Sequence, residues 1–473
     1  MTGFKLKSKR ALTALGMASA AGLMILSLGG CSHLPFVGGK KSSGDANAVA
    51  SQGERLSIVA FDQKLEPSRS LKGVGYYLPP AAPVESWPLT TGPQGELVQN
   101  AAAAKAFQVA WSKSIGVASK GKTEVMAQPV SDGKLIYTLD GEARVSAFDV
   151  NSGREAWSVD LNPHNKRDKV TYGGGLAYAN GKLYVTSGFR FLVALDPANG
   201  KTLWQKTVDT PLHAAPTVTD KYVVVTDVQN QIFAFNIDTG DMGWTYQAIA
   251  EPARIMKAPS PVVADNVVYA PFSSGELMAI NGESGQTVWE QVLAQSNRTN
   301  ALSEIRDISG HPVVYNGKVF AASHSGVFQA MDAGTGEPAW TVPVDSVNTP
   351  WVAGDVVFLV SLQGELICVN RDSGQIYWLK DLNEGAKVAK VSKGFLGLGK
   401  PKIGEDTPEW SGPFMASDRL VMVTSKGQAI ALDPKTGNVT NTLNLGGPAY
   451  LAPIAVGDKL FVVTDDAKLV AIR

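Results

Sequence analysis

The sequence is poor in the residues that most often build metal, redox and cofactor sites. It has two cysteines and five histidines in 473 residues, and the histidines are scattered along the chain without a pair at metal-ligand spacing. No Gly-x-Ser-x-Gly motif is present, so the sharp turn that exposes a hydrolase nucleophile is not predicted. We therefore predict no catalytic residue, no metal ion and no cofactor.

Charge of either sign is scarce as well. Charged residues make up 18% of the chain, and 43 basic side chains balance 43 acidic ones. A chain without net charge has no overall field that attracts polyanions, so nucleic acid is not expected as a partner. Apolar residues make up 44%, which is enough for a large core. The 48 glycines and 26 prolines indicate frequent turns and favour an all-β fold.

The N-terminus has the composition of a targeting segment. Four basic residues within residues 5–10 precede an apolar run over residues 11–28, whose length would also suit an uncleaved membrane anchor. Gly29 and Gly30 then lead directly to Cys31, and this ending resembles the lipobox of bacterial lipoproteins. The resemblance implies that residues 1–30 are a signal peptide and that acylated Cys31 anchors the mature chain. The residue after Cys31 is Ser32 and not an aspartate, which by the same resemblance implies the outer membrane.

One eleven-residue pattern occurs seven times in the remaining sequence. It consists of Ala, any residue, Asp or Asn, two variable residues, a small polar residue, Gly, three variable residues and Trp. The copies begin at Ala147, Ala194, Ala234, Ala279, Ala330, Cys368 and Ala431. Cys368 therefore occupies an alanine position, which predicts a small buried side chain and not a reactive thiol. The seventh copy has Asn441 in place of Trp.

The pattern is typical of a β-hairpin. An Asp or Asn at the start of the turn accepts hydrogen bonds from backbone amides that follow it, and Gly supplies a positive φ. The Trp then lies on the outgoing strand, where its ring fills the space between neighbouring sheets. A further strand pair precedes each copy. Four short strands in each unit of roughly 40–60 residues are typical of a propeller blade.

The two ends of the repeat region predict an eighth blade. Residues 468–473 form a strand with no turn or Trp after it, and residues 107–111 supply the missing outer strand. Pairing them would close the ring and remove its open edge. We predict an all-β fold, a single eight-bladed β-propeller over residues 101–473. Residues 31–100 are expected to be a lipid anchor and flexible tether, and residues 383–410 a long loop insertion.

Two connections between expected blades mix charged with apolar side chains. The first contains Arg254, Ile255 and Met256, and the second contains Glu304, Arg306 and Asp307. Both connections lead into the first strands of adjacent blades, so they should emerge on the same rim of the ring. Such a mixture is typical of protein–protein contacts, and we predict a partner-binding site there. A solvated loop with an internal ion pair is the alternative.

The repeat, together with the lipobox, the closure and the segment 304–314, resembles the BamB family of the machinery that inserts β-barrels into the outer membrane. The resemblance implies a non-catalytic scaffold lipoprotein on the outer membrane, facing the periplasm and docking on a BamA-type barrel subunit. The resemblance also implies that Asp307 fills an acidic contact position and that Arg254 or Met256 fills a basic one. Unfolded outer-membrane proteins are a second expected partner, which rests only on the sheet-rich surface and its strand edges. Ser309 departs from the family pattern, which has a second acid there.

Two other functions stay open. The repeat also resembles that of pyrroloquinoline-quinone dehydrogenases, which would imply an enzyme with a calcium-bound quinone in the centre of the ring. The chain has no adjacent cysteine pair, and its roughly 360 propeller residues leave little room for cap segments. The other alternative is a propeller lipoprotein that binds envelope glycans, because a fold does not fix a function.

Overall fold

The computed structural model describes residues 65–473 except 122, 165–171, 252–254, 256–258, 295–304 and 385–406. The predicted signal peptide, Cys31, the first part of the expected tether and most of the 383–410 insertion lie outside these residues. The described part of the chain contains 32 strands and one short 3₁₀ helix, η1 (Arg69–Leu71). Within it, no helix is both long and apolar enough to span a bilayer.

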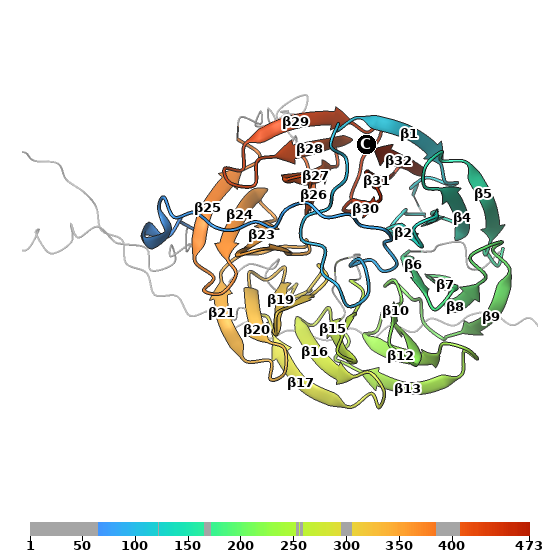
Figure 1. The fold of residues 1–473 in the computed structure, drawn as a ribbon. Coiled ribbons are helices and arrows are strands. Elements are labelled where there is room, and N and C mark those ends of the chain that lie inside the picture. The colour runs from blue at the N-terminus through green and yellow to red at the C-terminus, as the bar shows by residue number, and fades with distance from the viewer. Residues whose placement is uncertain are drawn as a thin grey trace, which may run out of the picture. The chain divides into compact units, whose positions relative to one another are not determined.

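The strands form eight four-stranded antiparallel sheets arranged in a ring, which confirms the predicted eight-bladed propeller (Figure 1). We number the blades along the chain and give their strands from the centre outward. Blades 1 to 4 consist of β2 (Val130–Ser131), β3 (Leu135–Leu139), β4 (Arg144–Asp149) and β5 (Glu155–Asp160); β6 (Gly174–Ala179), β7 (Lys182–Ser187), β8 (Phe191–Leu195) and β9 (Thr202–Thr207); β10 (Thr217–Val218), β11 (Tyr222–Thr226), β12 (Gln231–Asn236) and β13 (Met242–Gln247); and β14 (Val262–Ala264), β15 (Val267–Pro271), β16 (Glu276–Asn281) and β17 (Thr287–Val292).

The second half of the ring has the same organisation. Blades 5 to 8 consist of β18 (Val313–Tyr315), β19 (Lys318–Ala322), β20 (Phe328–Asp332) and β21 (Pro338–Val342); β22 (Trp351–Ala353), β23 (Val356–Val360), β24 (Glu365–Asn370) and β25 (Ile376–Asp381); β26 (Trp410–Ala416), β27 (Arg419–Thr424), β28 (Gln428–Leu432) and β29 (Val439–Asn444); and β30 (Ile454–Val456), β31 (Lys459–Thr464), β32 (Lys468–Ile472) and β1 (Val109–Ser114).

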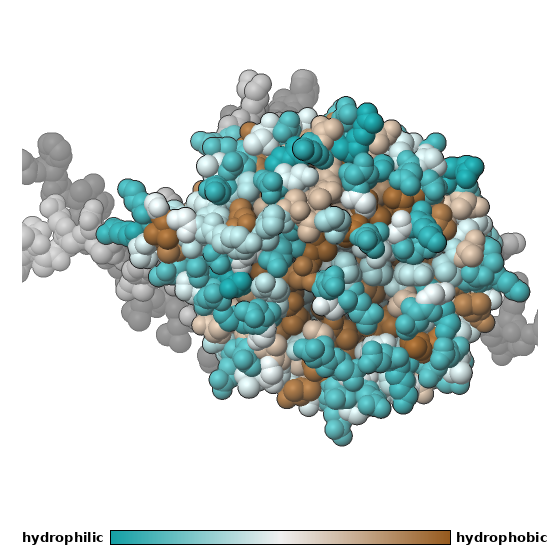
Figure 2. Space-filling view, viewed as in Figure 1, coloured by the Kyte–Doolittle hydropathy of each residue, from teal (hydrophilic) through white to brown (hydrophobic). Residues whose placement is uncertain are grey.

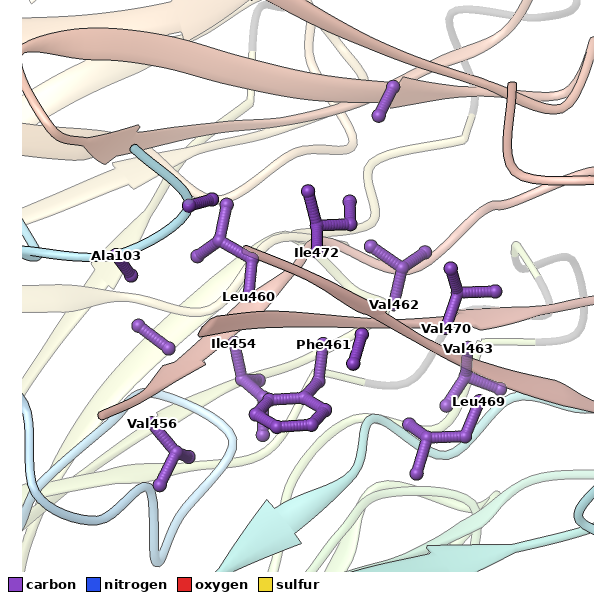
Figure 3. Close-up of a cluster of buried hydrophobic side chains, with 14 of the residues drawn as sticks. Ala103, Ile454, Val456, Leu460, Phe461, Val462, Val463, Leu469, Val470 and Ile472 are labelled. Atoms are coloured by element: carbon purple, nitrogen blue, oxygen red, sulfur yellow. The ribbon is translucent and has the colours of Figure 1, made fainter. Parts of the chain in front are cut away.

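Blade 8 closes the ring as predicted, because its outer strand comes from the start of the propeller. Strand β1 pairs with β32 in an antiparallel register that places Trp111 opposite Ala471 and Lys113 opposite Leu469. Apolar side chains of β30, β31 and β32 pack between this blade and its neighbours, as Figure 3 shows. The two ends of the propeller, β1 and β32, are therefore held by hydrogen bonds and by the core of blade 8.

The repeat forms the hairpin between the third and fourth strands of a blade. In blade 1, Asp149 Oδ1 accepts hydrogen bonds from the backbone N–H of Asn151 (3.2 Å) and of Ser152 (2.8 Å). Gly153 has φ +66°, and its N–H donates to the Asp149 carbonyl at 2.9 Å. The Asp side chain and the glycine thus fix the turn for the reasons predicted from the sequence.

The repeat glycine has a second role that the sequence did not reveal. A Cβ placed on Gly200 would lie 2.6 Å from the ring of Trp157, which belongs to the preceding blade, and Trp157 Nε1 donates to the Pro197 carbonyl at 2.9 Å. The same glycine–tryptophan contact recurs around the ring, including Trp111 of blade 8 on Gly153 of blade 1. The copy in blade 7 has Asn441 in place of Trp. The next blade, blade 8, has no turn between its third and fourth strands, so it has no turn glycine for a Trp to cover.

Residues 76–107 form a segment that we call the strap, which crosses one face of the ring (Figure 1). Trp87 pairs with Ser131 at the edge of β2, and the backbone N–H of Ala101 donates to the Met415 carbonyl of β26 at 3.0 Å. Trp87 is 2% exposed and packs on Phe414, with the ring centroids 5.5 Å apart. This packed segment differs from the flexible tether expected up to residue 100, because its apolar side chains are buried.

The strap also forms a hydrogen bond with one of the repeat tryptophans. Trp111 of blade 8 and four of the six repeat tryptophans donate directly to a backbone carbonyl of the next blade, but Trp378 Nε1 donates to the hydroxyl of Tyr76 at 2.8 Å. That hydroxyl donates in turn to the Pro434 carbonyl at 2.8 Å. Tyr76 therefore bridges blades 6 and 7 and ties the strap to the outer part of the ring.

Candidate partner-binding site

The strand order determines which loops share a face. In each blade, the turn between the first and second strands and, in blades 1 to 7, the turn between the third and fourth strands lie at the same end of the sheet. The strap contacts this end, as the hydrogen bonds from Asp355 N–H to the Tyr77 carbonyl and from Gly457 N–H to the Val84 carbonyl show. We call it the strap face. The turns between second and third strands and the connections between blades lie on the opposite side, the connection face.

The two predicted contact loops are both on the connection face. The first leads into β14 and the second into β18, in adjacent blades. The backbone N–H of Ile308 donates to the Phe272 carbonyl at 3.3 Å, and the N–H of His324 donates to the Asp307 carbonyl at 2.8 Å. The described part of the second loop is therefore held at Asp307 and Ile308 by the turns between second and third strands of blades 4 and 5.

Asp307 lies between the two loops and not at their surface. Its side chain is 3% exposed, and its Oδ2 accepts a hydrogen bond from the backbone N–H of Ile255. A buried carboxylate is tolerated only when hydrogen bonds compensate its lost hydration. The structure thus brings together two of the six predicted residues and makes Asp307 a link that holds the loops in place.

Two of the predicted side chains reach the surface of the described residues. Arg306 is exposed, and Ile255 is half-buried. Arg306 rests against the turn at Gly275, where a Cβ would lie 3.0 Å from both the Cβ and the carbonyl oxygen of Arg306. The other three predicted residues, Arg254, Met256 and Glu304, lie outside the described residues.

A polar cluster next to these loops was missed by the sequence reasoning. The backbone N–H of Ser260 donates to His311 Nδ1 at 3.0 Å, and the N–H of His311 donates to Thr349 Oγ1 at 3.0 Å. Burial lowers the pKa of His311 from its usual 6.5, although the contact of its Nδ1 with the Ser260 carbonyl at 3.2 Å opposes the shift. A sequence signal existed, because each of these three residues precedes a proline at the start of a first strand.

The centre of the ring contains a cavity of about 990 Å³. The strap residues Trp87 and Leu89 line it from the strap face, and Ile255 and His311 line it from the connection face. Apolar side chains gather around the middle of the strap face, where the strap crosses it (Figure 2). The candidate contact loops therefore also form part of the wall of the channel.

The described wall of the channel shows no cluster of His, Cys, Asp and Glu side chains for the calcium of a quinone site. Calcium requires several oxygen ligands that converge on one point. Among the residues that the structure describes, no group of three or more His, Cys, Asp and Glu side chains is placed to hold a metal ion. The arrangement offers loops and strand edges for binding, and we derive no reaction from it.

A family model described as outer membrane protein assembly factor BamB matches residues 141–380 and 381–473, which extend from blade 1 to the end of the chain. The chain belongs to the BamB family.

Individual BamB relatives are distant. The BamB of Yersinia pestis is 24% identical over 344 residues, which are 68% of this chain and 87% of that protein. An uncharacterized protein of Rickettsia conorii is 28% identical over 276 residues, which are 58% of this chain and 66% of that protein. The chain thus spans slightly less than two thirds of the length of the Rickettsia relative.

Solved structures share the propeller fold. BamB from Moraxella catarrhalis superposes with a TM-score of 0.63 at 17% identity, covering 77% of this chain and 99% of that chain. A quinohemoprotein alcohol dehydrogenase from Comamonas testosteroni gives a TM-score of 0.60 at 15% identity, covering 81% of this chain and 77% of that chain. At these identities the similarity establishes the fold and not an activity.

Proposed function

We propose that the chain is a non-catalytic scaffold for the assembly of outer-membrane β-barrel proteins and that its connection face docks on a BamA-type barrel subunit. Membership of the BamB family supports the assembly role. We choose this face because of the hydrogen bond between Asp307 and the backbone of Ile255, which links two adjacent loops. Arg306, next to Asp307, is exposed. The opposite face is crossed by the strap of the chain itself.

The geometry favours binding because the hydrogen bond between Ile255 and Asp307 fixes these two described residues relative to each other. A surface that is fixed before association loses less conformational freedom when the partner binds. The apolar Ile255 next to the charged Arg306 matches the mixture of apolar anchor and polar rim that is common in interfaces. In this proposal Asp307 positions the contact residues and does not itself contact the partner.

The proposal includes a location. Acylation of Cys31 would attach the chain to the inner leaflet of the outer membrane, with the propeller in the periplasm. The small residues before Cys31 support the acylation, and membership of the BamB family supports a location at the outer membrane. Unfolded outer-membrane proteins are proposed as a second class of partner, which would meet the propeller while it is docked.

Co-purification of the full chain from envelopes in mild detergent tests the docking. The wild-type chain should recover the barrel subunit in stoichiometric amount. Arg306→Glu should reduce that recovery about fivefold or more, because charge reversal at an interface replaces attraction with repulsion. Lys113→Glu is the matched control, since Lys113 is exposed on the outer strand of blade 8. Equal recovery by Arg306→Glu and the wild type would exclude this placement of the interface.

A further inference from the structure

The channel is surrounded by strand edges that can bind an extended chain. The innermost strand of every blade pairs with a strand on one side only, so its other edge is directed toward the centre of the ring. Strands β14 and β18 line the central cavity with Val262, Val263, Val313 and Val314. Free N–H and C=O groups along such an edge form a template for another strand.

The strap shows that these edges do bind polypeptide. Trp87 N–H donates to the Ser131 carbonyl at 3.1 Å, and Ser131 N–H donates to the Trp87 carbonyl at 2.7 Å. Gln94 Nε2 also donates to the Val218 carbonyl of β10 at 3.2 Å. Trp87 and Leu89 are both buried. The inner wall thus recognises one segment of this chain through its backbone and its apolar side chains together.

Two buried hydroxyl groups indicate that the wall near β14 and β18 is incomplete. Ser260 is 1% exposed and Ser309 is 6% exposed, and both residues line the cavity. Within the described part of the chain, neither side-chain oxygen has a hydrogen-bond partner. An unsatisfied buried hydroxyl costs about 1–3 kcal/mol, and rotation of either serine side chain toward the cavity would let a bound polar group remove that cost.

The charge of the channel mouth selects the kind of segment. Glu124, Glu409 and Asp465 line the cavity at the connection face, and Lys120 is the one Lys or Arg among its described lining residues. Burial and the charge of Asp465 raise the pKa of Glu124. A basic side chain at this mouth would relieve the repulsion between these carboxylates.

We propose that the connection-face half of the channel binds an extended polypeptide segment from another protein. Its backbone would pair with the edges of β14 and β18, its apolar side chains would enter the cavity, and a basic residue would lie near Glu124 and Asp465. This site adjoins the docking surface at Arg306, because Ile255 lies at both, but it uses the strand edges and the acidic mouth of the channel and not Arg306. It does not depend on the barrel subunit, so the two proposals can fail separately.

A defined peptide tests the site on the full chain in detergent. The probe is a fluorescein-labelled decapeptide of alternating valine and threonine that ends in two lysines, and the readout is fluorescence anisotropy. Ala452→Trp should plug the channel, because Ala452 lines the cavity and is partly buried. We expect this variant to lower the association constant about tenfold or more, which corresponds to about 1.4 kcal/mol.

Two further measurements make the result independent of the plug. A probe with alternate backbone nitrogens methylated should bind the wild-type chain about tenfold more weakly, because it lacks the N–H groups that pair with an edge. Glu124→Gln with Glu409→Gln should weaken binding about fivefold and reduce its salt dependence. The control pair Glu155→Gln with Glu337→Gln, at exposed positions of the outer hairpins, should change binding less than twofold.

The outcomes separate the proposal from its alternatives. It is overturned if the wild-type chain does not bind the probe, or if the methylated probe binds equally well. Displacement of the probe by an equal concentration of spermidine would also overturn it, since the site would then recognise small polycations. If Ala452→Trp does not fold, the methylated probe still decides the question on the wild-type chain.

Discussion

At the scale of single residues, the repeat shows why a short pattern was sufficient to predict the fold. The Asp or Asn side chain, the glycine and the tryptophan each have one local task, and each task was predictable from residue chemistry. The tasks are also coupled between blades, because the tryptophan of one blade covers the glycine of the next. That coupling depends on the distance between blades, which the sequence does not contain.

The glycine contact gives a direct prediction about stability. Gly285 has φ +73°, and a Cβ there would lie 2.7 Å from the Trp244 ring. Gly181 has a similar φ of +69° with nothing within 4 Å of the added Cβ. Gly285→Ala should lower the free energy of unfolding by about 3 kcal/mol, and Gly181→Ala by about 1 kcal/mol. Urea unfolding measures both losses, and equal losses would show that the ring contact is unimportant.

His311 predicts a dependence of stability on pH. Its folded pKa is below the usual 6.5, so the unfolded chain binds the proton more strongly. Stability should therefore fall as the pH decreases below about 6.5, by at most about 1.4 kcal/mol per pH unit from this group. His311→Gln should lose less stability than the wild type between pH 7.5 and 5.5. The same loss in both proteins would contradict the buried neutral histidine.

Predictions for the candidate site were less complete than those for the fold. Composition could indicate that charged and apolar residues are mixed in two loops, but it could not show which side chains face outward. Asp307 is turned inward because a backbone N–H of the other loop needs an acceptor, whereas Arg306 next to it is exposed. Such directions depend on contacts between segments about fifty residues apart, which no local pattern encodes.

At the scale of elements, the strap is the main departure from the sequence-based account. Its Gly, Ser and Pro content is typical of a linker, and its apolar residues are too widely spaced to predict a strand. The ring supplies the missing partners, namely the free edges of β2 and β26. A segment without regular structure of its own is thus ordered by surfaces that exist only after the blades have formed.

The strap should therefore contribute to stability as an element. Trp87→Ala would remove a side chain that is 2% exposed and lies between the strap and blade 7. We expect the free energy of unfolding to fall by about 3–4 kcal/mol, as for other buried aromatic residues. Hydrogen exchange should also become faster across residues 76–107. Tyr77→Ala is the control, because Tyr77 is 59% exposed and should change neither quantity appreciably. Unchanged hydrogen exchange across residues 76–107 in Trp87→Ala would contradict this account.

At the scale of the whole molecule, the ring is closed by strand pairing and its two faces differ. Closure between β1 and β32 leaves no blade with a missing strand. One face is crossed by the strap, whereas on the other the described residues Ile255 and Asp307 of two adjacent loops are joined by a hydrogen bond. The difference between the faces is what turns a nearly symmetric ring into a molecule with a defined side for a partner.

The most direct test of this account is site-specific photo-crosslinking in cells. A photoreactive residue would replace Arg306 on the connection face or Lys435, which is exposed in a turn of the strap face. The account predicts a crosslink from position 306 to the barrel subunit and none from position 435. A crosslink from position 435 with none from position 306 would contradict it, because the partner would then bind the face that the strap covers.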